Sequence, residues 1–414
     1  MSAASSYHKT TGGNALVKAF SSLQIKNYRW YWIGLVSGMV GMQMQILVRG
    51  WLVYAMTDSP LLLGLVTGAT GIPMLLATPL GGVLVDRSNK RNLILISEFI
   101  GTINSLIIFL LIFANTLEIW HLFVSSLVAG TCFAVNMPAR QAIIGDLVGE
   151  SQLINGVTLN SVGATIGRIM GPSLAGVLAG FIGMAWTYLA TTLLFGFVVY
   201  AMFLVRLPPG SVTSKHTHPL SDFAEGMRYA AKNRMILILV VLSAITIFLG
   251  MSYTSLLPVF AKDIFGTGPT GLGIMTSATA IGALAGSLMM AFFGNINRRG
   301  LYLLIATFCI GSFLVAFALS GNFYLSCAVL FIVGVANSIA AVLNNTIIQL
   351  EVDPHMRGRI LSLFAMTFGL MGIGSMPMGA LAEAIGTPIA VVSFGAMLAL
   401  CTAAIALMYP KVRQ

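Results

Sequence analysis

Charged side chains inside apolar stretches are the residues of this chain whose types and positions could do chemistry. Arg168 lies about 14 residues into one such stretch, roughly 21 Å along a helix. If the stretch crosses a membrane, a charge at that depth must face protein or water, because lipid does not solvate it. Arg168 could pair with helix carbonyls or with Glu98, anchor an anionic or carbonyl-rich substrate, or sense the protonation of a partner acid.

Carboxylates are scarce in the interior of these stretches. Glu98 is the clear case, and it could simply pair with an arginine near the cytoplasmic surface. Other acids lie at the predicted outer ends of the stretches: Asp58, Glu118, Asp263 and Glu383. A proton-driven carrier needs a group whose charge changes between its states. Glu98, Asp58 and Asp86 are therefore candidates for carrying a proton, and the sequence does not choose among them.

Further polar side chains extend the set of candidates. Arg49 lies one helical turn after Gln45, and the aromatic residues that follow it favour an anchor that snorkels to the outer interface, although the two could share a site. Polar side chains also occur in other apolar stretches: Asn160, Tyr253, Asn337 and Asn344. Taken singly, such residues are typical of helix packing. As a set they would suit a soft-walled pocket that accepts varied compounds.

The elements that must position these residues are long apolar helices. Hydrophobic residues make up 57% of the chain and charged residues 8%, whereas a soluble protein carries roughly 25% charged residues. A helix needs about 20 apolar residues to cross a bilayer. We expect twelve spans near residues 29–54, 62–85, 92–113, 119–138, 154–180, 184–205, 236–261, 271–293, 300–319, 323–346, 359–383 and 387–409. The predicted fold class is an all-α integral membrane protein, because backbone in lipid must form its hydrogen bonds within each helix.

The basic residues indicate how these helices are oriented. Of the 22 Lys and Arg, Lys262 lies on the predicted outer side, Arg49 and Arg168 lie within spans, and the others, including Arg140, fall on one side. By the positive-inside rule that side is the cytoplasm, with both termini there and an even number of spans. The net charge of +10 therefore reflects membrane topology, and we expect no nucleic-acid partner.

Two parts of the chain repeat each other in the same direction. Residues 63–70 match residues 272–279 at an offset of 209, and residues 143–144 match 347–348 at an offset of 204. Parallel repeats in membranes are typical of transporters. We therefore expect a cytoplasmic segment 1–28, a six-helix bundle 29–205, a linker 206–235, a second six-helix bundle 236–410 and a cytoplasmic tail 411–414. Within the linker, residues 220–232 place apolar side chains on one face of an amphipathic helix at the membrane surface.

The turn between the second and third spans carries four charges, Asp86, Arg87, Lys90 and Arg91. They could be a helix cap with ordinary inside-positive charge. They could also form a latch, in which Asp86 accepts hydrogen bonds from a helix N-terminus of the other half. Arg87, Lys90 and Arg91 would then pair with acids and keep the cytoplasmic opening of the protein closed in one state. Asn295 replaces Asp86 in the repeat, which predicts a weaker second latch.

Small residues line the fifth span at helical spacing: Gly163, Gly167, Gly171 and Gly176, with Pro172 among them. They predict that a neighbouring helix approaches closely. Pro172 removes a backbone hydrogen bond, which could let the helix bend as two halves rock.

Several of these motifs resemble a known family. Residues 82–91 read Gly-x-x-x-Asp-Arg-x-x-Lys-Arg and resemble the loop motif of the major facilitator superfamily. Residues 167–176 are similar to that superfamily's fifth-helix motif of antiporters and exporters. Residues 136–142, 257–261 and 357–359 resemble the branch that contains the enterobactin exporter and macrolide efflux proteins.

The resemblance implies a secondary transporter of the bacterial inner membrane that exports a small lipophilic compound, such as a drug, macrolide or siderophore. Transport would proceed by alternating access with a proton as coupling ion, in a monomer. No nucleophile triad or phosphate-binding motif stands out, so we expect no enzymatic activity, cofactor or metal centre. The alternatives are a nutrient or metabolite importer or facilitator, and a receptor or scaffold that keeps the fold without transport.

Overall fold

The computed structural model describes residues 20–207, 219–293, 297–353 and 356–410, without the side chains of residues 77–87, 219–224 and a few within 357–365. In this part of the chain all regular secondary structure is helical. Ten of the described helices are long and apolar enough to cross a membrane. The predicted all-α membrane fold is thereby confirmed.

The N-terminal half of the chain forms six long helices. They are α2 (Lys26–Thr57), α3 (Pro60–Arg87), α4 (Lys90–Phe113), α5 (Ile119–Val148), α6 (Leu153–Phe181) and α7 (Met184–Leu204), with short 3-10 turns η1 (Ser21–Gln24) and η2 (Glu150–Gln152). The Ser59 hydroxyl caps α3 by accepting a hydrogen bond from the Leu62 amide. Helix α5 continues well beyond the predicted end near residue 138, because Arg140 is buried within the protein and the apolar residues that follow it continue the buried face of the helix.

The C-terminal half contains α9 (Arg234–Gly250), α11 (Gly268–Phe292), α12 (Arg299–Leu319), α13 (Phe323–Glu351), α14 (Arg357–Met366), α15 (Gly369–Ile385) and α16 (Thr387–Met408). After α9 the backbone changes type three times, through the 3-10 helix η3 (Ser252–Leu256), the short α10 (Leu257–Val259) and the π-helical η4 (Phe260–Ile264). Pro258 lies at this irregular stretch and has no amide hydrogen to donate. The predicted span 236–261 therefore changes helix type along its length, and the predicted span 359–383 is divided between α14 and α15.

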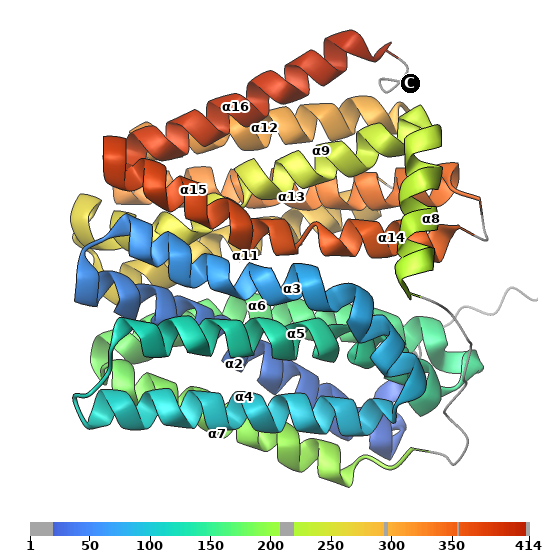
Figure 1. The fold of residues 1–414 in the computed structure, drawn as a ribbon, viewed down its shortest axis with the longest axis horizontal. Coiled ribbons are helices and arrows are strands. Elements are labelled where there is room, and N and C mark those ends of the chain that lie inside the picture. Colours follow the sequence, from blue (N-terminus) through green and yellow to red (C-terminus); the bar gives the residue numbers. More distant parts are fainter. Residues whose placement is uncertain (1–19, 208–218, 294–296, 354–355, 411–414) are drawn as a thin grey trace, which may run out of the picture.

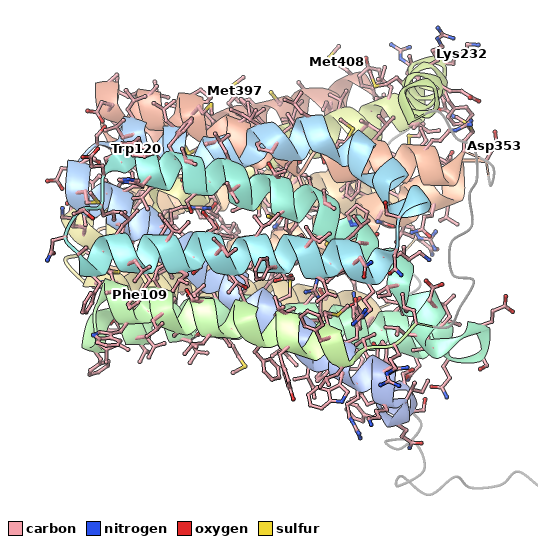
Figure 2. The ribbon with its side chains drawn as sticks, turned by 60° about the horizontal axis from the view of Figure 1, so that its bottom comes forward. Phe109, Trp120, Lys232, Asp353, Met397 and Met408 are labelled. Atoms are coloured by element: carbon pink, nitrogen blue, oxygen red, sulfur yellow. The ribbon has the colours of Figure 1, made fainter. Side chains whose placement is uncertain are left out.

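The helices of the two halves lie side by side, and α8 (Pro219–Lys232) runs across one of their ends (Figure 1). Figure 2 shows side-chain nitrogen and oxygen atoms gathered at the end where Lys232 and Asp353 lie and again near Trp120 at the opposite end. Exposed apolar side chains such as Phe99 and Ile103 of α4 lie between the two ends, as expected for a surface that faces lipid. These ends are termed the α8 end and the distal end below.

Two helix pairs make most of the contact between the halves, α3 with α15 and α6 with α11, and α3 also contacts α8 and α14. Glycines bring the backbones together: a Cβ added at Gly71 would lie 2.6 Å from the Gly369 carbonyl oxygen, and one at Gly176 would lie 2.8 Å from Gly273 Cα. Along α3 these close contacts run from Gly64, near the distal end, to Leu75. The halves are therefore in backbone contact through the distal part of the molecule.

A second close contact recurs inside each half. Gly130 of α5 packs so tightly on the Thr70 carbonyl of α3 that no Cβ would fit, and Gly334 of α13 packs in the same way on the Thr279 carbonyl of α11. Thr279 follows Thr70 by 209 residues, and Gly334 follows Gly130 by 204. These are the two offsets of the sequence repeat, so equivalent residues make equivalent contacts.

Candidate functional site

Arg168 is an exposed charge in the middle of a helix. It lies about 20 Å from either end of α6, yet its side chain is exposed. At about 100° per residue it lies on the face opposite the exposed apolar side chains of Met170 and Val177. The next residue, Ile169, accepts a hydrogen bond from Ser277 of α11 at 3.5 Å. Arg168 therefore faces the space between the halves beside their contact, and no described acid forms an ion pair with it.

Polar contacts between the halves close the distal rim. They pair Lys262 with Asp58, Tyr54 with Asp263, and Glu383 with Ser59. Glu383 also accepts a hydrogen bond at 3.2 Å from the Leu61 amide, in the first turn of α3. Sequence reasoning located these acids at span ends but did not find their partners, because each partner belongs to the other half.

Glu98 forms a buried ion pair with Arg140. Arg140 Nη2 lies 2.8 Å from Glu98 Oε1, and the two side chains are 8% and 11% exposed. Asn136 joins them, since its amide donates to Glu98 at 3.0 Å and its oxygen accepts from Arg140 Nε at 2.5 Å. The Tyr31 hydroxyl lies 2.9 Å from the Arg140 carbonyl and 3.1 Å from Asn160 Oδ1. One polar network thus connects α2, α4, α5 and α6.

The position of Arg140 corrects its assignment to the cytoplasmic surface. Arg140 precedes the end of α5 at Val148 by about 12 Å, and it is 6% exposed. Its burial is possible because Glu98 supplies the opposite charge. The signal in the sequence was the spacing of Asn136 and Arg140, which lie one helical turn apart and so share a face.

Arg49 is buried inside the N-terminal half. It is 5% exposed, and its Nη2 donates to Thr70 Oγ1 at 3.3 Å. Gln45, one turn earlier, is also 5% exposed. The expectation that Arg49 snorkels to the interface is wrong, because α3 and α7 pack on α2 and cover this face.

The remaining polar candidates lie in the C-terminal half. The Tyr253 ring is buried against Phe317, with centroids 6.2 Å apart. Asn337 Nδ2 donates to Met251 Sδ at 3.1 Å, and Asn344, two turns further along α13, is buried. The described side chains do not bring the candidates into one soft-walled pocket. Of the candidate residues, Arg168 opens most clearly onto the space between the halves.

The charged turn after α3 makes its described contacts within the N-terminal half. Lys90 Nζ lies 2.6 Å from Asp146 Oδ2, at the end of α5. Arg91 donates to the carbonyl oxygens of Met202 and Phe203 of α7, at 2.9 and 3.0 Å. Arg91 thus binds carbonyls rather than the acid expected for a latch. The latch prediction for Asp86 and Arg87 falls on side chains outside the described part of the chain.

The glycines of α6 serve two different neighbours. Gly167 and Gly171 face α2, and a Cβ at Gly171 would lie 2.5 Å from Gln43 Cβ. Gly176 faces α11 of the other half, and the Pro172 carbonyl lies 2.7 Å from the position of a Cβ on Gly273. The stripe therefore contributes both to packing within one half and to the contact between halves.

Nearly the whole chain matches a known family of membrane proteins. The model of the major facilitator family described as transmembrane secretion effectors matches residues 17–414. The protein belongs to this family. A transmembrane secretion effector of the major facilitator superfamily is a secondary transporter that exports small compounds, and it is not an enzyme. The chain is accordingly a multi-pass protein of the bacterial inner membrane.

Named relatives of this secretion effector cover most of its length. A staphyloferrin A transporter from Staphylococcus aureus is 25% identical over 81% of this chain and 84% of its own. Macrolide efflux protein A from Streptococcus pyogenes is 23% identical, over 80% and 81% of the two chains. An enterobactin exporter from Shigella boydii is 27% identical, over 86% and 84%. The macrolide efflux protein and the enterobactin exporter belong to the two kinds of protein that the sequence motifs resemble.

Solved structures show the same fold at low sequence identity. A nucleoside transporter aligns with a TM-score of 0.75 and 16% identity, over 94% of this chain and 98% of its own. A bacterial homologue of the human lysosomal transporter Spinster, solved facing inward and unoccupied, aligns with a TM-score of 0.74 and 16% identity, over 96% and 98%. Both share the overall helix arrangement with this secretion effector.

Proposed function

We propose that this secretion effector exports a small, largely lipophilic compound by alternating access, with a proton moving in the opposite direction. The substrate enters from the α8 end and reaches the space beside Arg168. The halves then rock so that the distal contacts separate and the compound leaves on the far side. Substrates of the kinds named for the relatives, siderophores and macrolides, are the first to test.

The observation that carries this proposal is the exposed position of Arg168 at the edge of the distal contact between the halves. In the distal part, glycines hold α3 on α15 and α6 on α11, and polar pairs close the rim. Arg168 lies at the edge of this contact and is exposed. A mid-membrane arginine stays charged and needs water or an anionic group nearby. This arrangement supports a state that is closed distally and accessible from the α8 end.

The proposal includes twelve spans in two six-helix bundles. Ten described helices qualify as spans by length and composition. We assign α3 as a further span, and α14 together with α15 as the last. The matched contacts Thr70–Gly130 and Thr279–Gly334 support a parallel repeat, because equal sequence offsets give equal packing.

The orientation rests on the distribution of charge. Basic residues concentrate at the α8 end, which supports a cytoplasmic location for that end and for both termini by the positive-inside rule. A tag fused after Gln414 should then be protected from a membrane-impermeant reagent in intact cells and react after lysis. Reaction in intact cells would contradict the orientation. We take the functional unit to be a monomer, which the mass of the detergent-purified protein would test.

We assign the coupling proton to Glu98. Protonation of this carboxylate would remove its ion pair with Arg140 and release the side chains of Arg140 and Asn136. Asp58 is the alternative carrier, but its contact with Lys262 lies at the distal rim and is largely exposed. Glu98→Gln should therefore abolish the response of transport to a pH gradient, whereas Asp58→Asn should keep it.

Transport in proteoliposomes tests the function. A catecholate siderophore, a macrolide and a lipophilic cation are each followed with and without an imposed pH gradient. We expect uphill movement of at least one compound when protons flow in the opposite direction. Arg168→Ala should abolish this uphill transport. Arg168→Lys should retain part of the transport, because lysine keeps the positive charge but lacks the planar guanidinium group. Arg299→Ala, which removes a charge at the start of α12, is the control.

Other outcomes identify the alternatives. Movement that ignores the pH gradient would indicate a facilitator or a different coupling ion. Accumulation of the compound on the side that corresponds to the cytoplasm would indicate an importer. No movement above that of vesicles with denatured protein, for any compound, would favour a receptor or scaffold on the same fold.

A further inference from the structure

A second polar cluster lies in the distal part of the N-terminal half. It consists of Gln45 and Arg49 of α2, Thr70 of α3 and Tyr188 of α7. Gln45 and Arg49 are 5% exposed, and Tyr188 is fully buried. Arg49 and Tyr188 are close enough to interact electrostatically. At about 100° per residue, Gln45 and Arg49 lie on the face of α2 that points away from α6, so this cluster is separate from Arg168.

The cluster contains buried hydrogen-bond donors without an acceptor among the described residues. Within this part of the chain, Arg49 Nη1, Gln45 Nε2 and the Tyr188 hydroxyl each lack a hydrogen-bond partner. The Arg49 guanidinium makes one described hydrogen bond, at 3.3 Å to Thr70 Oγ1. A buried donor left unpaired costs free energy that a bound acceptor would recover. Three such donors in one cluster favour the binding of an acceptor there.

The cluster also contains an uncompensated positive charge. A guanidinium stays protonated in proteins, and a buried charge is stable when an opposite charge lies beside it. The described acids in this half that form ion pairs have other partners: Glu98 binds Arg140, Asp146 binds Lys90, and Asp58 binds Lys262. Asp86 follows Thr70 by 16 residues of α3, or about 24 Å, which is too far for it to reach Arg49.

We infer that this cluster binds one small anion, held by the Arg49 guanidinium and by donors from Gln45 and Tyr188. A water molecule could satisfy the donors but would leave the charge uncompensated. The near-complete burial of the donors limits the ligand to a halide ion or a small carboxylate, and excludes a whole macrolide or siderophore. The inference concerns binding and does not rest on the proposed export.

Anion-dependent thermal stability tests the site. The full-length protein in detergent is heated in sodium gluconate, sodium chloride or sodium acetate at equal ionic strength and pH. A ligand that binds the folded state raises the unfolding midpoint as its concentration rises. We expect a saturable increase with chloride or with acetate relative to the bulky gluconate. The anion that acts distinguishes a free halide from a carboxylate as the occupant.

Three variants assign the effect to the cluster. Arg49→Gln should eliminate the anion-dependent shift, and Arg299→Gln, at the start of α12 and outside the cluster, should keep it in full. Tyr188→Phe, which removes one donor and little volume, should weaken binding about tenfold. Equal midpoints of the parent protein in all three salts would overturn the inference. If Arg49→Gln does not fold, an unchanged concentration dependence in Tyr188→Phe and Gln45→Met would overturn it instead.

Discussion

Arg140 of α5 and Glu98 of α4 form a 2.8 Å ion pair whose members both belong to the N-terminal half. Asp58 and Lys262, by contrast, pair across the two halves. Rocking of the halves would leave the first pair intact and separate the second. The first pair should therefore stabilise one half in every conformation until Glu98 is protonated, whereas the second should act on the balance between conformations.

Loss of one member of the buried pair should destabilise the protein. Arg140→Met leaves Glu98 buried without a partner, which should lower the free energy of unfolding by about 3–5 kcal/mol. The double change Glu98→Leu with Arg140→Met should recover much of this loss, because no uncompensated charge remains. Thermal unfolding in detergent measures both. Lys90→Met, in the more exposed pair with Asp146, is the control and should lower the free energy of unfolding by about 1 kcal/mol or less. Equal losses of stability in Lys90→Met and Arg140→Met would contradict the special contribution of the buried pair.

Loss of the distal pair should make the distal side easier to open. Ser375 of α15 is buried against α3, where its hydroxyl donates to the Gly64 carbonyl at 3.0 Å. In a background without the four native cysteines, Ser375→Cys should react with a thiol reagent from the distal side only when the halves part. Lys262→Gln should speed this labelling by up to about fivefold, since an exposed pair contributes about 1 kcal/mol at most. Exchanging the charges, Asp58→Lys with Lys262→Asp, should restore the slow rate, and a rate that stays fast would contradict a role for the pair.

A bulky side chain at a glycine contact should keep the two halves from closing against each other in the distal part of the molecule. Gly71→Leu would force α3 away from α15, because a Cβ there already lies 2.6 Å from a carbonyl oxygen. We expect permanently fast labelling of Ser375→Cys and loss of transport. Gly101→Leu on α4 is the matched control, since a Cβ at Gly101 meets nothing within 4 Å. If the two variants transport equally well, the backbone contact is not needed for the transport cycle.

Gly171→Leu should act differently from Gly71→Leu. Gly171 contacts α2 of its own half, where a Cβ would lie 2.5 Å from Gln43 Cβ. The substitution should lower the thermal midpoint, because overpacking of a tight helix contact costs about 1–3 kcal/mol. An unaltered midpoint would show that α6 can shift on α2 without loss.

Asp86→Asn remains a prediction of the sequence. The change keeps hydrogen-bonding shape and removes the charge, so it should slow transport without changing the thermal midpoint. Equal transport rates at equal expression would show that Asp86 is an ordinary helix cap.

The positions of most spans followed from the sequence, because the length of an apolar stretch is fixed by the bilayer whatever the helix packs against. The burial of single charged side chains could not be predicted from the sequence in the same way. Arg49 and Arg140 were both expected near a surface, yet both are buried. Their surroundings are set by α3 and α7 in one case and by Glu98 of α4 in the other. Such partners lie far away in the chain, and helical periodicity shows which face a residue occupies but not which helix covers it.

Inward of the polar pairs at the distal rim, the halves meet largely through backbone, since Gly64, Gly68 and Gly71 of α3 lie against the glycine-rich face of α15; this glycine contact is termed the seal. Peptide groups are the same whatever the cargo, so the seal offers few side chains that could discriminate between compounds. Selection among cargoes must then take place earlier, on the α8 side of the seal. In laboratory evolution toward a new cargo, substitutions should accordingly occur around the Arg168 face of α6, and the glycines between α3 and α15 should remain unchanged.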